Sequence, residues 1–297
     1  MAIVSVRIFP AIGIARLGNS PDGFFIGPEV PGDHTPPAGG YKDASCQMKR
    51  QAARFRIYGF DAAGNQVQEI TNSDAAIEWT VELANTKGSW RRFNGADAGL
   101  PGRNGLTGAA IGNSPPHQIN PGPRTLNGPN QAAAFNTGQF LGKFVPLGEM
   151  RTEADGRLLV LGGFGRSAGV PASVPLQDIF NNNNWHDDVS DGPVTARVTL
   201  NGTATPLLAD PAWVICAPPN FAPPVTPITT LYDVLFQVAR DKGWVNIPAL
   251  PSFTLDIWPL LQRTLDYRWG ELHLQGRLHP AQEQIHDVAR WHLQPRS

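Results

Sequence analysis

The 297-residue sequence has no excess of charge of either sign. Lysine and arginine together number 24, aspartate and glutamate 25, and the formal net charge is -1. Charged residues make up only 16% of the chain. A protein that binds nucleic acid or an anionic membrane surface needs a basic face. We therefore expect no nucleic-acid partner and no membrane partner.

The sequence also lacks a long apolar run and a secretion signal. A helix that spans a bilayer needs about 20 apolar residues in succession, and no stretch approaches that length. Residues 1–7, MAIVSVR, contain neither a long apolar segment nor a cleavage site. These absences predict a soluble, cytoplasmic protein.

Cysteine is almost absent, with Cys46 in a polar stretch and Cys216 at the end of an apolar one. We expect Cys46 to be exposed and Cys216 to be a buried small hydrophobe. A disulfide between them stays open, although the expected compartment is reducing. No CxxC pair and no zinc-ligand spacing occurs, so the sequence predicts no metal site built on cysteine.

Common catalytic signatures are missing as well. Residues 162–167, GGFGRS, are rich in glycine but match neither GxxxxGK[ST] nor a GxGxxG that opens a helix. We interpret them as the exit of a strand. No GxSxG occurs, so a hydrolase serine has no support.

The residues that are abundant indicate short strands joined by turns. The 41% of hydrophobic residues allow a sizeable core. The 31 glycines and 28 prolines are expected to interrupt regular secondary structure often. We predict a mainly β protein with some α structure. An antiparallel, β-sandwich-like domain at residues 1–224 is followed by a helical extension and a partner-facing tail at 225–297.

Apolar alternation and turn residues place the elements. Strands are predicted at 3–9, 12–17, 51–60, 66–71 and 77–83, a hairpin of 144–152 with 157–163 around Asp155-Gly156, and a strand pair of 195–200 with 212–217 around Asn201-Gly202. Residues 94–134 have no period and are predicted to form a long irregular connection. Helical spacing predicts a helix at 230–240 and a second, broken by Pro259, at 252–265.

The densest group of ionisable residues lies in the segment 181–193, NNNNWHDDVSDGP. The candidate site residues are His186, Asp187, Asp188 and Asp191, set between asparagines that favour turns and a Gly-Pro that is expected to force one. Three interpretations stay open: a metal site with carboxylate ligands, an acid–base site in which the carboxylates raise the pKa of His186, and a structural loop held by Asx turns. No EF-hand pattern is present. The histidines at 273, 279, 286 and 292 have no HExxH spacing and give only a weak zinc signal.

Nine ordered blocks resemble a known family. They are 9–20 (FPAIGIARLGNS), 25–29 (FIGPE), 41–43 (YKD), 49–56 (KRQAARFR), 83–87 (LANTK), 147–152 (LGEMRT), 156–163 (GRLLVLGG), 182–193 (NNNWHDDVSDGP) and 251–257 (PSFTLDI). The resemblance is to the lysine 6-oxidase and glycine oxidase family of quinoproteins. It covers residues 4 to about 260 and only the N-terminal half of the family's chains, which are roughly twice as long.

The resemblance implies a cofactor that is carried elsewhere. The family's cysteine tryptophylquinone joins a cysteine to an oxidised tryptophan in the C-terminal half, near an aspartate. No position here matches these three residues, so no catalytic residue carries over. The implied protein is the non-quinone subunit of a two-chain amino-acid or amine oxidase. Its substrate is a small amino acid or amine, its products include ammonia and hydrogen peroxide, and its partner resembles the family's C-terminal half.

Two other functions stay open at this point. One is a non-catalytic binding or scaffold module derived from the oxidase family. The other is an enzyme of different chemistry that uses His186 and the neighbouring aspartates. Catalysis by this chain is expected only in complex with a quinone-bearing partner.

Overall fold

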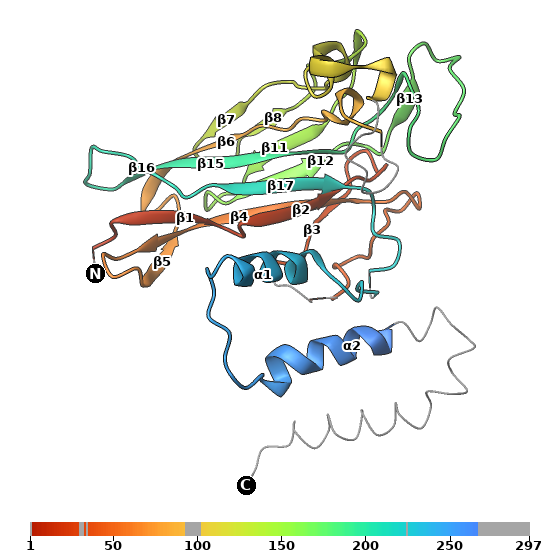
Figure 1. The fold of residues 1–297 in the computed structure, drawn as a ribbon. Helices are drawn as coiled ribbons and strands as arrows, with labels where there is room; N and C mark the ends of the chain where they lie inside the picture. The colour runs from red at the N-terminus through yellow and green to blue at the C-terminus, as the bar shows by residue number, and fades with distance from the viewer. Residues whose placement is uncertain (1, 30–32, 34, 93–101, 224, 267–297) are drawn as a thin grey trace. The chain divides into compact units, whose positions relative to one another are not determined.

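A computed structural model describes residues 2–29, 33, 35–92, 102–223 and 225–266 (Figure 1). The chain divides into two compact units, residues 1–220 (unit 1) and 221–297 (unit 2). Within the described part of the chain, no helix is both long and apolar enough to cross a bilayer. The predicted tail and its four histidines, His273, His279, His286 and His292, lie outside the described residues.

Unit 1 consists of strands and short 3-10 helices. Its strands are β1 (Ser5–Phe9), β2 (Ile12–Arg16), β3 (Phe24–Ile26), β4 (Arg50–Phe60), β5 (Gln66–Ile70), β6 (Ala75–Val81), β7 (Arg124–Asn127), β8 (Ala132–Ala134), β9 (Gln139–Phe140), β10 (Lys143–Phe144), β11 (Gly148–Thr152), β12 (Leu158–Gly162), β13 (Ser167–Gly169), β14 (Trp185–Asp187), β15 (Ser190–Leu200), β16 (Leu207–Leu208) and β17 (Ala212–Ala217). The 3-10 helices are η1 (Lys87–Ser89), η2 (Arg103–Gly105), η3 (Gly108–Ala110) and η4 (Pro115–His117).

One mixed sheet dominates unit 1. Its described strands run in the order β7-β6-β15-β17-β2-β4-β12-β11-β8, with β1, β3 and β5 paired to β4 and β16 paired to β15. The pairs β17–β2 and β3–β4 are parallel, and the other pairs in the sheet are antiparallel. The terminal strands β7 and β8 contact each other, so the sheet curls until it nearly closes. The mainly β, sandwich-like fold class predicted from the sequence is confirmed.

The core lies inside the curled sheet. Alternate residues of β4, β6 and β15 are buried, among them Phe55, Trp79 and Val194. The indole N–H of Trp79 donates to the carbonyl of Gly156 at 2.8 Å, so the one polar atom of this buried ring has a partner. This continuous core holds the strands in the register that the alternation predicts.

Most predicted strands are present, and two predictions about connections are wrong. The strands at 3–9, 12–17, 51–60, 66–71 and 77–83 and the Asp155-Gly156 hairpin are confirmed. The segment 94–134 is not wholly irregular, because it contains β7 and β8. The strand at 212–217 pairs with Ser190–Val194 rather than with 195–200, and β16 occupies the place beside Arg197 and Val198.

Gly192 and Pro193 do not form the turn that their sequence favours. Both lie inside β15, opposite Val214 and Trp213 of β17. On the other side the Glu82 N–H donates to the carbonyl of Pro193 at 3.2 Å, and proline has no N–H to return. A Cβ at Gly192 would stand 1.7 Å from the Glu82 carbonyl oxygen. The glycine therefore permits a close approach of two strands rather than a reversal of the chain.

The outer face of β4 carries a network of ion pairs. Arg54 and Arg56 both bind Glu29, the latter through Nε at 2.7 Å, and Arg56 also contacts Glu69 at 3.2 Å. Arg157 completes the link with Glu69 at 2.7 Å. Burial acts to raise the pKa of Glu29, but hydrogen bonds and charges from Arg56 and Arg54 outweigh burial and hold the pKa at about 2, below its ordinary 4.5.

This lowered pKa predicts a loss of stability in acid. The folded chain holds Glu29 ionised below pH 4.5 while the unfolded chain protonates it, so the contribution is complete above pH 4.5 and disappears as the pH falls toward 2. Because Glu29 is partly exposed, we expect only about 1 kcal/mol. Glu29→Gln should lower the free energy of urea unfolding by that amount at pH 7 and by less at pH 3. An equal loss at both pH values would contradict the ion-pair origin. Glu78→Gln, in an exposed pair with Arg197 at 3.8 Å, is the control.

Unit 2 contains two helices. Helix α1 (Leu231–Asp241) begins at a capping box, in which Thr230 and Asp233 satisfy each other's backbone N–H groups. A π-helical turn (Phe253–Ile257) leads into α2 (Trp258–Asp266). The predicted helix at 230–240 is confirmed. The predicted break at Pro259 is not seen, because the π-helical turn continues directly into α2 and Pro259 lies in the first turn of α2, where proline is tolerated.

Candidate functional site

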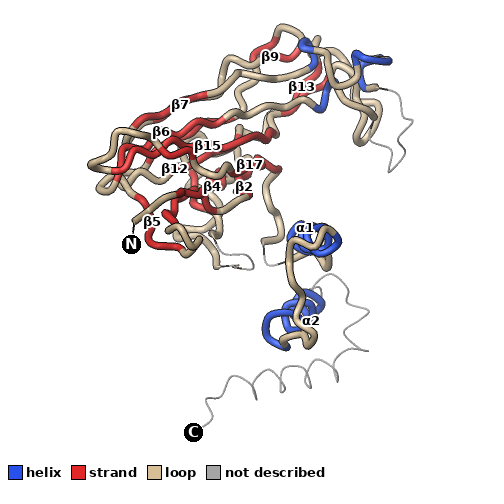
Figure 2. The backbone as a smooth tube through the Cα atoms, turned by 60° about the vertical axis from the view of Figure 1, so that its left-hand side comes forward, coloured by secondary structure: helices blue, strands red, loops and turns tan. Residues whose placement is uncertain are grey.

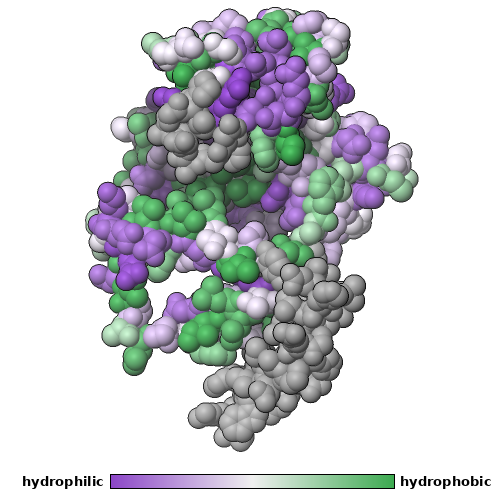
Figure 3. Space-filling model, turned by 45° about the vertical axis from the view of Figure 1, so that its right-hand side comes forward, coloured by the Kyte–Doolittle hydropathy of each residue, from purple (hydrophilic) through white to green (hydrophobic). Residues whose placement is uncertain are grey.

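The candidate residues lie at the end of unit 1 where the sheet gives way to 3-10 helices and loops. Figure 2 shows β9 and β13 beside these short helices, and Figure 3 shows polar side chains gathered at the same end. The strands β13 and β14 form a separate two-stranded sheet in which Ala168 pairs with His186. This pairing fixes Trp185–Asp187 in extended backbone, so successive side chains point in opposite directions.

Asp187 is held by two residues that sequence reasoning did not single out as site residues. Its carboxylate forms an ion pair with the Lys87 ammonium group. The buried amide of Asn85 donates to both the carbonyl oxygen and Oδ1 of Asp187, each at 3.1 Å. Asn85 is itself fixed because its N–H and C=O exchange hydrogen bonds with Ile119 at 2.9 Å. Both partners belong to the block 83–87, LANTK, which is the one signal that the sequence offered.

His186 faces an aromatic cluster rather than the carboxylates. Its ring lies 5.6 Å from that of Phe140, and the Phe140 ring lies 5.8 Å from that of His117. Burial lowers the pKa of His186, and the opposing charge of Asp187 is too weak to reverse the shift. The prediction that the neighbouring carboxylates raise this pKa is wrong, because burial outweighs the charge of Asp187.

Asp188 is buried against the glycine-rich strand exit. Its Oδ1 accepts the N–H of Arg166 at 3.0 Å. A Cβ at Gly163 would stand 2.5 Å from its Oδ2, so this glycine makes room for the carboxylate. Burial raises the pKa of Asp188 although backbone N–H groups oppose the shift. The segment 162–167 is therefore a strand exit, as the mismatch with phosphate-loop patterns predicts. It also holds the Asp188 carboxyl group.

Asp191 lies apart from the other three. Its Oδ2 accepts the indole N–H of Trp213 at 3.0 Å on the exposed side of the β15–β17 pair. The four candidate side chains thus have different partners, and the described residues contain no group of three or more His, Cys, Asp or Glu side chains placed to hold a metal ion. Hydrogen bonds of this kind fit the structural interpretation of the segment best.

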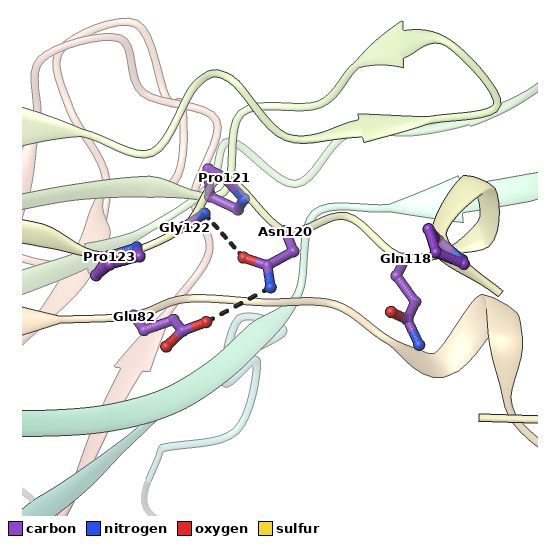
Figure 4. Close-up of a pocket in the computed structure, with 7 residues that line it drawn as sticks. Glu82, Gln118, Asn120, Pro121, Gly122 and Pro123 are labelled. Atoms are coloured by element: carbon purple, nitrogen blue, oxygen red, sulfur yellow. Dashed lines mark hydrogen bonds between the residues drawn. The ribbon is translucent and has the colours of Figure 1, made fainter. Parts of the chain in front are cut away.

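The described part of unit 1 has two surface depressions whose linings contain none of the four candidates. One, of about 560 Å³, is lined by Glu82, Pro115, Gln118, Asn120, Pro121, Gly122 and Pro123. Figure 4 shows the Asn120 amide bridging Glu82 and the Gly122 N–H. The other, of about 480 Å³, is lined by Asn19, Pro21, Gln47, Phe164, Gly165 and Arg166. Neither lining contains a nucleophile beside a base.

The contacts of Asn85 predict a structural penalty when it is removed. Asn85→Ala leaves the carbonyl of Asp187 without its amide donor in a largely buried place. We expect the free energy of urea unfolding to fall by about 1–3 kcal/mol. The exposed Asn113, which bonds only locally to Ala109 at 3.3 Å, is the control, and Asn113→Ala should change stability by less than about 0.5 kcal/mol. Equal effects of the two substitutions would show that the Asn85–Asp187 contact is not stabilising.

Comparisons with known proteins show which family this chain resembles. Residues 9–216 match the family model described as L-lysine epsilon oxidase N-terminal. L-lysine 6-oxidase of Marinomonas mediterranea is 29% identical over an alignment of 320 residues, which covers 90% of this chain and 43% of the relative. The chain therefore spans less than half the length of the relative it matches.

Solved structures agree with the sequence comparison. The structure of the epsilon-lysine oxidase from Marinomonas mediterranea superposes with a TM-score of 0.75 at 28% identity, over 89% of this chain and 45% of that one. The Schiff base intermediate of the same organism's L-Lys epsilon-oxidase with L-Lys superposes with a TM-score of 0.74 at 28% identity, over 92% and 46% of the two chains. The resemblance found in the sequence blocks is confirmed.

Proposed function

Because the chain belongs to the L-lysine epsilon oxidase N-terminal family, we propose that it is the non-quinone subunit of a two-chain amino-acid or amine oxidase. A second polypeptide, corresponding to the rest of the relatives' length, carries a cysteine tryptophylquinone. The complex converts a primary amine, dioxygen and water into a carbonyl compound, ammonia and hydrogen peroxide. The amine is oxidised by two electrons and dioxygen is reduced by two.

The observation that carries this proposal is the uneven coverage of the match. The relative's name identifies it as a lysine oxidase, and its similarity accounts for 90% of this chain but only 43% of the relative. More than half of that oxidase thus has no counterpart in the matched region. Under this proposal, the second part is supplied by another polypeptide.

The described residues of this chain do not fit the quinone. Cys216 is completely buried, and burial raises the pKa of its thiol to about 12, which suppresses the reactive thiolate. Trp213 lies on the same strand but faces outward while Cys216 faces the core. Cys46 is exposed in the turn that Asp43 closes, and residues 41–48 contain no tryptophan. No step of the reaction is therefore assigned to this chain.

The role left to unit 1 is to present surface to the partner. The proposal places the segment 181–193 at or near that interface. It is supported by the connection before it, where Leu176 and Ile179 point apolar side chains into solvent, the latter 88% exposed. Large exposed apolar side chains beside a polar rim are typical of protein interfaces.

Co-purification from the native host tests the proposal. The full chain is recovered under native conditions, every co-purifying band is weighed by intact mass spectrometry and stained for quinone redox activity, and amine-dependent peroxide release is assayed. A stained partner and peroxide released with amines are the expected results. A chain recovered alone, unstained and at its plain sequence mass would overturn the proposal and favour the binding or scaffold module.

A further inference from the structure

Helix α1 of unit 2 has a broad apolar surface that the described residues of its unit leave exposed. Leu231, Leu235 and Val238 follow helical spacing on one face and are 50%, 46% and 42% exposed. The stacked rings of Tyr232 and Phe236, 6.0 Å apart, widen the apolar surface on one side. Among residues 221–223 and 225–266, the single buried apolar side chain is Leu265.

An uncovered helix of this kind is unstable by itself. Isolated helices shorter than about 12–15 residues are marginal in water, and most helical stability in proteins comes from packing of the apolar face. The 11 residues of α1 have a complete capping box at Thr230. Arg263 of α2 adds an ion pair to Asp233 at 2.6 Å. The sequence thus fixes the N-terminal end of the helix, whereas its apolar face remains exposed among the described residues of unit 2.

The charges of α1 favour a protein partner over a lipid surface. Its polar edge carries Asp233, Arg240 and Asp241 and is not basic. Helices that lie on anionic membranes carry lysine and arginine along the polar face. A protein surface with an apolar groove accepts such a helix through residues spaced as Leu231, Leu235 and Val238 are.

The length of the relatives indicates which protein the apolar face of α1 contacts. Unit 1 ends at Asn220, and the structural match covers up to 92% of the 297 residues, so the match includes part of unit 2. In those oxidases more than half of the chain lies outside the matched region. We propose that the apolar face of α1 docks onto the quinone-bearing polypeptide. This inference rests on the proposed function and names the surface that joins its two subunits.

Alanine substitutions test the face without breaking the helix. The triple variant Leu231→Ala, Leu235→Ala and Val238→Ala removes apolar area while raising helix propensity. The control variant combines Gln237→Ala, on the polar face of α1, with Leu208→Ala, an exposed residue of β16 that is 72% exposed. Each full chain is expressed in the native host and purified as above. Unfolding of each variant, followed by circular dichroism, confirms that unit 1 is intact.

The triple variant is expected to recover at most about one tenth of the quinone-stained partner that the wild type recovers. The control variant is expected to recover as much as the wild type. Equal recovery by all three would overturn the docking inference and leave the two-chain oxidase standing. Failure of the wild type to recover a stained partner would overturn both. Sedimentation of the purified wild type then identifies the other occupant, since a dimer that the triple variant abolishes would assign the face to a second copy of this chain.

Discussion

Replacing Gly192 with alanine is expected to destabilise unit 1 by about 3 kcal/mol or more, or to prevent its folding. The added Cβ would stand 1.7 Å from the carbonyl oxygen of Glu82. That oxygen belongs to the backbone, so no side-chain rotation relieves the overlap. The strand β15 must separate from the 82–84 segment, which also breaks the paired hydrogen bonds of Ala84 with Asp191 at 3.0 and 3.1 Å.

The same substitution two residues beyond the end of β15 provides the control. Gly202 has a left-handed backbone (φ +82°) and no atom within 4 Å of an added Cβ. Gly202→Ala should therefore cost only the conformational penalty, about 1 kcal/mol. Urea unfolding of both variants, followed by tryptophan fluorescence, measures the difference. If Gly192→Ala costs no more than Gly202→Ala, the two strands are not as close as described.

The second large effect concerns a buried charge. The Arg50 guanidinium is 2% exposed, donates to Glu149 at 2.8 Å and lies 4.5 Å above the ring of Phe164. Burial acts to raise the pKa of Glu149, but hydrogen bonds from Arg151 and Arg50 outweigh it and the pKa is lowered. Glu149→Ala leaves Arg50 buried without a counter-ion, and we expect the free energy of unfolding to fall by about 3–5 kcal/mol.

Replacement of both charged residues separates the ion pair from the packing. Arg50→Met combined with Glu149→Leu removes both charges and should recover most of the stability lost in Glu149→Ala, since buried pairs are often replaceable by apolar residues. Glu78→Ala, which breaks the exposed pair with Arg197, should cost less than about 1 kcal/mol. A loss of that small size for Glu149→Ala as well would show that Arg50 is solvated rather than buried.

Local patterns predicted those strands whose burial follows from their own residues. Strands β4 and β6 alternate buried and accessible side chains, and the Asp155-Gly156 hairpin depends on a two-residue turn preference. Strand β7 carries no such pattern, since only one of its four residues is buried. It exists because β6 offers it hydrogen bonds. The local period of apolar residues cannot show which strands, distant in the sequence, pair with each other.

The predicted turn at Gly192-Pro193 is wrong, and both this turn and the partners of the candidate side chains depend on residues distant in sequence. A Gly-Pro pair indicates a turn only when no neighbouring segment pairs with it. Here the backbone of Glu82 bonds to Pro193. The sequence grouped His186, Asp187, Asp188 and Asp191 correctly as a cluster along the chain. It did not reveal that an extended backbone sends their side chains to Phe140, Lys87, Arg166 and Trp213. The family resemblance is confirmed because it rests on whole blocks of sequence rather than on single residues.

The position of β2 has a consequence for how the protein is made. In the sheet β2 lies between β4 and β17, and its parallel register places Ile12 beside Trp213. During synthesis on the ribosome, one edge of this N-terminal strand therefore waits unpaired until residues 212–217 have emerged. Such an open edge is a template for pairing between nascent chains. The order of emergence thus makes closure of the sheet a late, long-range event, and truncated chains that end before β17 are those most exposed to aggregation.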